Sequence, residues 1–424
     1  MLDIKKHIVP VVAAALCSAV MASCTPGDVT PEVSPEPTPV QTISPTPTPD
    51  VIQNAQVKVE NVEKRGYCGQ TARWEFGDNG KLVIYGTDKI NDYEAEVGTR
   101  APWAELDVNS IYINEGISYI GNFAFYGMAG VTDISVPETV CQTGYDAFDG
   151  TAWYENQTEQ FVTIGDGILI KYNGASRDVS IPYGVKFISN AFKENTDNLK
   201  HDEDIASIKM PDSVTEIGSH AFYSCRFLHG VSFSAKLEVI GDSAFENSGI
   251  RSDITLPENV RSIGSRAFAM CNELYSIKLP ASLETISDFA FADSNINRFS
   301  IPENVSNIGK NPFLNCQLIK KFEVSDENEF FATDSNGILY TKDLSVLIAC
   351  PDGLGYNNPV ISSQVTEIKP YAFLSCNAVE QVSISDNVKK IGDSAFGGSV
   401  ILKVKANSAA QRYAHENGYA YEKF

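Results

Sequence analysis

Apolar and small residues return at a regular interval along most of the chain. The interval is clearest in residues 256–278, where charged and turn residues separate these positions: Leu256, Val260, Ile263, Ala267, Phe268, Cys271, Leu274 and Ile277. A phenylalanine, preceded by alanine in all but one case, marks each repeat: Phe125, Phe148, Phe192, Phe222, Phe245, Phe268, Phe291, Phe313, Phe373 and Phe396. Phe245, Phe268 and Phe291 follow one another at 23 residues. A fixed period between roughly 20 and 50 residues indicates stacked supersecondary units.

Each repeat predicts two short extended segments joined by corners, one around Ile263 and one around residues 277–279. A unit this short cannot bury its apolar side chains alone, so neighbouring units must stack and share one continuous core. The period also lies in the range of leucine-rich repeats, roughly 20 to 29 residues. We therefore predict a leucine-rich-repeat solenoid over residues 108–405, mostly β, with short parallel strands stacked in about ten coils.

Two longer intervals interrupt the repeat, near residues 151–178 and 317–358. Each contains a Gly-Ile-Leu strand after an acidic turn, beginning at Gly167 and at Gly337. This pattern predicts hairpins that project from the stack. Insertions in repeat proteins map to loops on one face and often bind ligands, but they can equally shield a local bend, and the sequence leaves both readings open.

The two ends of the solenoid need covers. Residues 56–107 contain strand patterns separated by Gly and Asn turns, with a hairpin turn predicted at Asp78-Asn79-Gly80, and we expect an N-terminal β capping module there. Its tryptophans, Trp74 and Trp103, are expected in the core of this module; the alternative is a small carbohydrate-binding module that uses them. Residues 406–424 predict a short capping helix, with Ser408 as N-cap and Gly418 at its C-terminal end.

The N-terminus has the pattern of an export signal. Lys5 and Lys6 precede an apolar run from 8 to 21, and the small residues Ala22 and Ser23 precede Cys24. Residues 1–23 thus resemble a bacterial lipoprotein signal peptide, which would make Cys24 the lipidated first residue; the alternative is an ordinary secretory signal with an incidental cysteine. Residues 24–55 are rich in Pro and Thr and predict an extended linker that holds the rest of the chain away from the membrane.

Several motifs together resemble a known family. The run Cys68-Gly69, Trp74, Gly80, Ile84-Tyr-Gly86 and Pro102-Trp103, followed by Ile-Gly-x-x-Ala-Phe repeats, looks like the start of bacterial cell-surface leucine-rich-repeat lipoproteins of the BspA type. The resemblance covers nearly everything after the linker. It implies a protein on the bacterial cell surface that adheres to a protein or glycan ligand on host extracellular matrix, on host cells or on other bacteria.

Charge narrows the choice of partner. The chain has 33 Lys and Arg against 54 Asp and Glu, a net charge of −21, which disfavours nucleic acid because phosphate contacts need basic stripes. One outward column of the strand near residue 278 has no acid at all, and we predict it as a ligand face: Ser135, Ser180, Lys209, Ser232, Thr255, Lys278, Ser300 and Ser383. The alternative is that Ser and Thr simply suit a parallel ladder.

Chemical motifs are explained by repeat position. Gly-Asp-Ser at 241–243 and at 392–394 imitates the start of a serine-hydrolase block but falls on the same corner of two repeats. Four cysteines, three residues after the repeat phenylalanine, predict a buried small-residue column and no disulfide framework: Cys225, Cys271, Cys316 and Cys376. Residues 334–337 are interpreted as a turn, because the other ligands of a calcium loop are missing.

We therefore predict a monomeric adhesion protein without catalytic residues, metal or cofactor, which contacts the membrane only through its N-terminal lipid. A second hypothesis is a glycan-capturing surface lipoprotein that uses aromatics of the N-terminal module and the inserts. A third, the least favoured, is a hydrolase whose residues meet only in three dimensions.

Overall fold

The computed structural model describes residues 56–96, 98–192, 205–251 and 253–424 of the chain. The predicted signal peptide (1–23), Cys24 and the predicted linker lie outside these residues. In the described part, short strands follow one another almost without interruption, and the helices are α1 (Ala152–Glu155) and α2 (Ala409–Glu416). The predicted fold class, a mostly β solenoid of stacked parallel coils, is confirmed.

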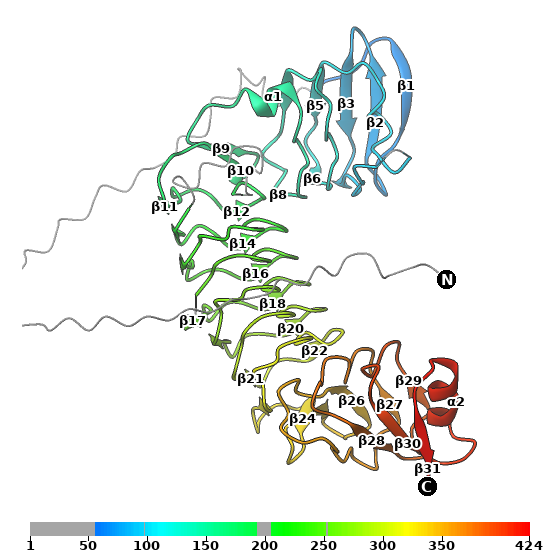
Figure 1. The fold of residues 1–424 in the computed structure, drawn as a ribbon. Helices are drawn as coiled ribbons and strands as arrows, with labels where there is room; N and C mark the ends of the chain where they lie inside the picture. Colours follow the sequence, from blue (N-terminus) through cyan, green and yellow to red (C-terminus); the bar gives the residue numbers. More distant parts are fainter. Residues whose placement is uncertain (1–55, 97, 193–204, 252) are drawn as a thin grey trace, which may run out of the picture. The chain divides into compact units, whose positions relative to one another are not determined.

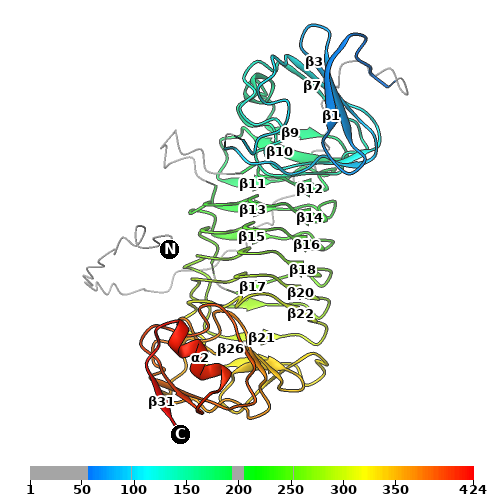
Figure 2. The same ribbon diagram turned by 90° about the vertical axis from the view of Figure 1, so that its right-hand side faces the viewer.

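A typical coil gives one short strand to each of two parallel ladders, which lie side by side in Figure 2. The first ladder contains the strands that end near a Pro corner: β11 (Asp178–Ser180), β13 (Ser207–Lys209) and β15 (Gly230–Ser232); β17 (Ile254–Thr255) and β19 (Ile277–Lys278); β21 (Phe299–Ile301) and β23 (Phe322–Val324). The second ladder is continuous through β12 (Phe187–Ile188), β14 (Glu216–Ile217), β16 (Val239–Ile240), β18 (Ser262–Ile263), β20 (Thr285–Ile286) and β22 (Asn307–Ile308). Pairing Ile240 with Ile263 and Ile263 with Ile286 places equivalent repeat positions directly over one another.

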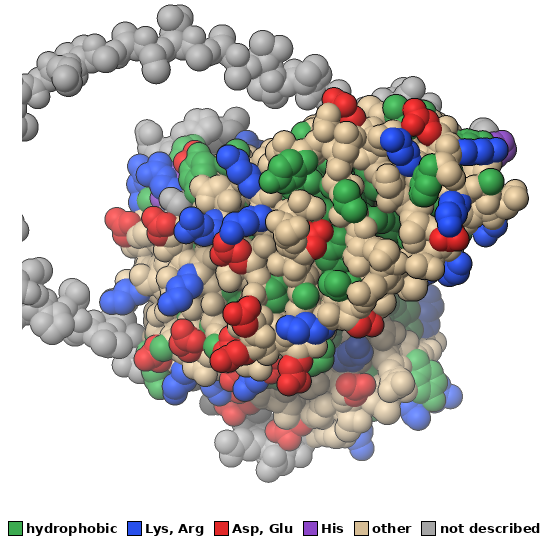
Figure 3. Space-filling model, turned by 90° about the horizontal axis from the view of Figure 1, so that it is seen from below, with side chains coloured by type: hydrophobic (Ala, Val, Ile, Leu, Met, Phe, Trp, Pro, Cys, Tyr) green, Lys and Arg blue, Asp and Glu red, His purple; other side chains and the backbone are tan. Residues whose placement is uncertain are grey.

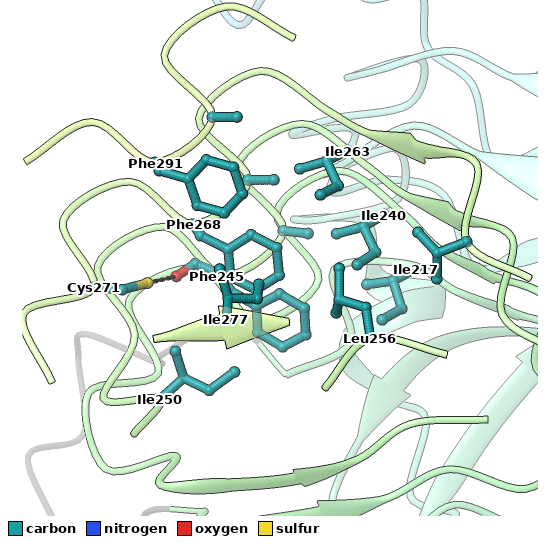
Figure 4. Packing of buried hydrophobic residues seen from close by; sticks show 14 of the residues in the cluster. Ile217, Ile240, Phe245, Ile250, Leu256, Ile263, Phe268, Cys271, Ile277 and Phe291 are labelled. Atoms are coloured by element: carbon teal, nitrogen blue, oxygen red, sulfur yellow. Dashed lines mark hydrogen bonds between the residues drawn. The ribbon is translucent and has the colours of Figure 1, made fainter. Parts of the chain in front are cut away.

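The repeat phenylalanines form a stack inside the coils. Between Phe222 and Phe313 the ring centroids of successive coils are 5.0, 5.3, 5.6 and 6.0 Å apart, and the rings are within 10° of parallel. Figure 4 shows Phe245, Phe268 and Phe291 in this stack, with the isoleucines of the second ladder beside them. All of these rings are fully buried, so the most regular residue of the sequence is core.

The glycine of the Ile-Gly-x-x-Ala-Phe corner is required by the close approach of coils. A Cβ atom at Gly264 would lie 2.5 Å from the carbonyl carbon of Gly241 and 2.6 Å from the backbone nitrogen of Asp242. Backbone atoms cannot move aside as a flexible side chain could, so only glycine fits here.

The N-terminal segment continues the sheet of the first coils. The strands β1 (Val62–Tyr67), β2 (Arg73–Gly77) and β3 (Lys81–Tyr85) are antiparallel, and Asp78, Asn79 and Gly80 between β2 and β3 all have positive φ, as the predicted turn requires. The strand β3 then pairs in parallel with β5 (Ser110–Ile113), and β5 pairs with β7 (Asp133–Ser135). A second small sheet joins β4 (Asp88–Lys89), β6 (Ile117–Ile120) and β8 (Gln142–Thr143).

Both inserts contain an antiparallel pair, but they do not project from the stack as expected. In the first insert β9 (Phe161–Ile164) pairs with β10 (Ile168–Tyr172), and β10 also pairs in parallel with β12 of the second ladder. In the second insert β24 (Phe331–Thr333), β25 (Leu339–Thr341) and β26 (Val346–Ala349) are successive antiparallel strands, and β26 pairs in parallel with β27 (Glu367–Ile368). The hairpins therefore extend the ladder.

In each insert, strands with consecutive buried residues, β10 in the first and β25 and β26 in the second, divide the core. In β10, Leu169 packs in the central core, whereas Ile168 and Ile170 pack in the N-terminal core. In the second insert Leu339 faces the central core, whereas its neighbour Tyr340 faces the C-terminal core. Each insert is thus a wall between two hydrophobic cores, and Figure 1 shows β9 with β10 and β24 with β26 at these two levels of the chain.

The C-terminal end is closed by a helix and a last strand. The Ser408 hydroxyl accepts a hydrogen bond from the Gln411 N–H at 3.1 Å, and Gly418 has a φ of 75° just after the helix, so both predicted caps are confirmed. Ala410 and Ala414 of α2 are fully buried against the last coil. The strands at this end of the chain are β28 (Gln381–Ile384), β29 (Lys390–Ile391), β30 (Ile401–Val404) and β31 (Tyr421–Lys423).

Candidate ligand-binding surfaces

The predicted ligand face lies on the outer side of the first ladder. Seven of its eight residues are exposed, and Ser135 is half-buried. Ser180 pairs with Lys209, and Lys209 with Ser232, in the sheet formed by β11, β13 and β15. Thr255 pairs with Lys278 in the next sheet. The structure therefore brings most of these residues into short in-register groups, while it leaves their role as a ligand face a prediction.

The column also contains an acid, contrary to the prediction. Strand pairing places Glu323 beside Ser300, and Glu323 forms an ion pair with Lys321 at 3.0 Å. The expectation of a column without acid is therefore wrong at this position. The position of each outward residue is predicted from the repeat phenylalanine that follows it. No such phenylalanine closely follows β23, because the second insert separates this strand from the next repeat.

A second row of outward residues, two positions earlier in each strand, adds more carboxylates. Asp133 accepts a hydrogen bond from the Tyr112 hydroxyl at 3.1 Å, and Asp253 accepts one from the Ser276 hydroxyl at 2.7 Å. Asp178 does the same with Ser207 in β13. The face is therefore mixed in charge. It has no basic stripe that would attract an acidic ligand.

The two tryptophans of the N-terminal segment are buried. Trp103 is fully buried, donates a hydrogen bond from Nε1 to the Ala124 carbonyl at 2.8 Å and stacks on Phe125. Trp74 is 6% exposed and contacts Trp103 edge-on, with ring centroids 5.9 Å apart. Neither ring is available to a sugar, so the hypothesis that these tryptophans capture a glycan is wrong, because both rings are needed in the core.

Aromatic side chains gather at the corner near His220, a cluster that the repeat pattern does not predict. The His220 ring lies 4.3 Å from the Tyr145 ring and 5.3 Å from the Tyr223 ring, and Phe123 packs on Tyr145 at 4.9 Å. Burial lowers the pKa of His220, while nearby carboxylates, Glu246 foremost, act in the opposite direction. The imidazole is thus a half-buried packing partner of these aromatic rings.

The residues that imitate catalysis have structural partners. The Ser243 hydroxyl of the Gly-Asp-Ser corner donates to Glu246 Oε2 at 2.6 Å, and the Arg266 guanidinium binds the same carboxylate at 2.6 and 2.9 Å. Ser243 is buried, with 7% of its surface exposed. Its hydroxyl is therefore directed to an ion pair that joins neighbouring coils.

The acidic turn of the second insert has a structural explanation. In the turn between β24 and β25, Asp334 Oδ1 accepts the N–H groups of Asn336 at 2.9 Å and Ile338 at 3.0 Å, which confirms the predicted turn. Among the residues that the structure describes, no three His, Cys, Asp or Glu side chains gather as metal ligands would.

Three cysteines of the predicted column, Cys271, Cys316 and Cys376, are buried, whereas Cys225 is half-buried. Cys271 Sγ lies 3.1 Å from the Phe245 carbonyl and 3.6 Å from the Ser248 hydroxyl of the preceding coil. Cys316 makes the equivalent contacts with Phe291 and Ser294. Burial raises the pKa of both thiols to about 12. These groups are therefore unreactive parts of the core.

The stacked coils, the paired parallel ladders and the repeated Ala-Phe corner define a leucine-rich-repeat solenoid. The chain belongs to the BspA-type leucine-rich-repeat family: the family model described as "BspA type Leucine rich repeat region (6 copies)" matches residues 102–203, 198–320 and 353–420, more than half of the chain. Members of this family are typically surface proteins. Among the described helices, neither is long and apolar enough to cross a membrane.

Several solved structures of bacterial proteins are similar to this chain. A leucine-rich cell surface protein from Faecalibacterium prausnitzii is 25% identical, with a TM-score of 0.44, over 58% of this chain and 75% of that one. The pneumococcal vaccine antigen PcpA is 19% identical, with a TM-score of 0.46, over 81% of this chain and 72% of that one. A leucine-rich-repeat protein from Bacteroides ovatus is 17% identical, with a TM-score of 0.36, over 84% of this chain and 99% of that one. Comparison with curated proteins found no match.

Proposed function

We propose that this chain is a surface-displayed binding protein that engages a protein or glycan ligand of host matrix, host cells or other bacteria and catalyses no reaction. The observation that carries the proposal is that the repeated positions and the exposed positions are different residues. The recurrent Phe, Ala, Ile and Cys positions are mostly buried and form the scaffold, whereas the outer strand column and the insert loops face solvent. Extended repeat surfaces of this kind serve binding in other solenoids.

Display follows from the N-terminal sequence. A lipid on Cys24 would anchor the chain at the outer side of a membrane, and the Pro-rich residues 24–55 would hold the solenoid away from it. Mass spectrometry of the mature N-terminus tests the anchor, and protease treatment of intact cells tests the display. A mature chain that starts at an unmodified residue other than Cys24 would refute the lipid anchor.

The ligand face is tested by reversing its charge. The triple variant Lys209→Glu, Thr255→Glu and Lys278→Glu changes three exposed residues of the first ladder. A matched control, Thr215→Glu with Lys236→Glu and Lys389→Glu, makes the same changes at exposed residues outside this column. Both proteins should keep the far-UV circular dichroism of the original chain, because none of these side chains is in the core.

Binding is measured by pulldown from host matrix extract, host-cell lysate and bacterial surface extract, with the captured proteins identified by mass spectrometry. We expect the face variant to lose at least tenfold in captured ligand, and the control variant to lose less than twofold. Equal capture by both variants would remove the ligand face from the proposal, and no specific capture from any of the three sources would refute the binding function.

A further inference from the structure

A hollow opens beside the second insert, where the first ladder is interrupted. Its volume is about 590 Å³, within the range of roughly 300–1,000 Å³ typical of small-molecule sites. It is lined by the turn residue Asn336, by Ala378 and by a loop, Gly355, Tyr356, Asn357, Asn358, Pro359 and Val360. Between β23 and β28 this loop takes the place of a strand, and it joins the ladder through a single bridge from Val360 to Ser383 and through the Asn357 carbonyl.

The walls of the hollow are held by hydrogen bonds. Asn336 lies in the tight turn that the Asp334 carboxylate caps. On the other side, the Asn357 carbonyl accepts the N–H groups of Glu380 at 2.8 Å and Gln381 at 3.1 Å, and Pro359 is buried beneath the loop. Residues from two separate segments therefore face the hollow from positions that their backbones fix.

The lining is uncharged and carries unused polar groups. None of its eight residues is acidic or basic, although the chain as a whole has a net charge of −21. The side-chain amides of Asn336 and Asn358 have no hydrogen-bond partner among the described residues, and each amide offers both a donor and an acceptor. Tyr356 is 59% exposed and Val360 is 73% exposed, so an aromatic ring and an apolar side chain stand open to solvent beside these amides.

This combination selects against most ligand classes. An anion would find no cation in the lining, and a purely apolar molecule would leave the amides of Asn336 and Asn358 without partners. A pyranoside has hydroxyl groups that pair with planar amides, and a face of C–H groups that packs on the negative face of an aromatic ring. We propose that the hollow is a binding site for a neutral pyranoside, with Tyr356 as the stacking platform and Asn336 and Asn358 as the hydroxyl partners.

The site adjoins the outer column, since Val360 lies beside Ser383 and Ser383 pairs with Lys403. A glycan seated in the hollow could therefore extend along the C-terminal end of the column. The proposal deepens the proposed function and rests on it in one respect, because a surface-displayed chain is the one that meets extracellular glycans.

The test uses the full chain and saturation-transfer difference NMR with methyl glycosides of glucose, galactose, mannose and N-acetylglucosamine. We expect at least one of them to bind, and expect Tyr356→Ala to lower its affinity at least tenfold. Tyr356→Phe keeps the ring and should stay within about twofold of the original chain. The double variant Asn336→Ala with Asn358→Ala should lower affinity at least fivefold. Tyr183→Ala removes a similarly exposed tyrosine, 54% accessible, outside the hollow and should change nothing.

A second arm presents the same sugars as terminal residues of immobilised glycoproteins. Binding in either arm supports the site, and the tighter arm distinguishes a linked glycan from a free sugar. The proposal is overturned if no sugar binds, or if the binding of every sugar survives Tyr356→Ala. It is also overturned if members of a peptide library bind and no sugar does. If no sugar binds, but pulldown captures a protein that the triple ligand-face variant no longer captures, the proposed function stands and the sugar site is refuted.

Discussion

The carboxyl group of Asp352 is the most unfavourably placed charge in the described core. It is 5% exposed; Cys376 Sγ lies 3.4 Å from Oδ1, and Oδ2 has no partner among the described residues. Burial raises the pKa of Asp352 from 3.8 to about 7, although hydrogen bonding from Cys376 and from the backbone of Asn315 and Cys316 works in the opposite direction. Replacing Asp352 with Asn keeps the shape and removes the titration.

The sign of the effect follows from the two pKa values. In the unfolded chain the carboxyl loses its proton near pH 3.8, whereas in the folded chain it keeps the proton until about pH 7. Stability therefore falls as pH rises from the lower value and is lowest above the higher one. A difference of about three pH units corresponds to roughly 4 kcal/mol in total, of which about 3 kcal/mol is lost between pH 5 and pH 8.5. Asp352→Asn does not suffer this loss.

Urea unfolding followed by far-UV circular dichroism at pH 5 and pH 8.5 measures this difference. The free energy of unfolding of Asp352→Asn, relative to the original chain, should be about 3 kcal/mol more favourable at pH 8.5 than at pH 5. Asp326→Asn makes the same substitution at an exposed position and should show no such change between the two pH values. An equal difference for Asp352→Asn at both pH values would mean that this carboxyl is already ionised in the fold, and would refute the reasoning.

Three further predictions concern the scaffold. Phe268→Ala removes a fully buried ring between Phe245 and Phe291 and should cost about 3–5 kcal/mol in urea unfolding, whereas Met270→Ala, at a residue 40% exposed, should cost far less. Gly264→Ala forces a Cβ atom into the backbone of Gly241 and should lower the melting temperature; Gly398→Ala has open space and should not. In the native protein the exposed Cys141 should react rapidly with a thiol reagent such as DTNB, and Cys271 and Cys316 only after unfolding; fast labelling of Cys271 or Cys316 in the native Cys141→Ser variant, located by mass spectrometry of its peptides, would contradict their burial.

The sequence alone was sufficient to predict the residues that repeat. Periodic placement of Phe268 and its equivalents can be satisfied only if each lies over the next, so the stack, the adjacent cysteine column and the two ladders followed from spacing. The C-terminal helix was equally predictable, because Ser408 and Gly418 act through local hydrogen bonding and backbone conformation.

The position of the insert hairpins was harder to predict, because a hairpin can either project from the stack or be buried within it. The continuous apolar run Ile168-Leu169-Ile170 was the available signal, since a strand that faces solvent on one side alternates and a strand buried on both sides does not. Its residues pack in two different cores, and an alternating pattern would have left polar groups in one of them. The expectation of projecting hairpins gave too little weight to this run.

The hollow could not be predicted, because its parts have no period. Asn336 lies in the turn between β24 and β25, Asn358 in the loop after β26, and Ala378 in the following coil. Only the path of the chain between them brings these residues together. The same break in the repeat hid Glu323, since no repeat phenylalanine immediately follows its strand to give the register.

The places where the repeat fails are therefore the places where the surface acquires its own chemistry. In a regular coil, each outward side chain is fixed beside its equivalents at the strand spacing, so a ladder of equivalent side chains results. Where the second insert separates β23 from β28, the coil can no longer supply a paired strand, and the loop at Tyr356 is free to leave its ring and neighbouring amides open. The strands β25 and β26 of the same insert separate two hydrophobic cores, so the insert is anchored in the interior while it interrupts the repeat at the surface. Binding specificity among proteins with the same scaffold should accordingly vary with the inserts more than with the coils, and exchange of residues 331–360 should transfer sugar preference without loss of the fold.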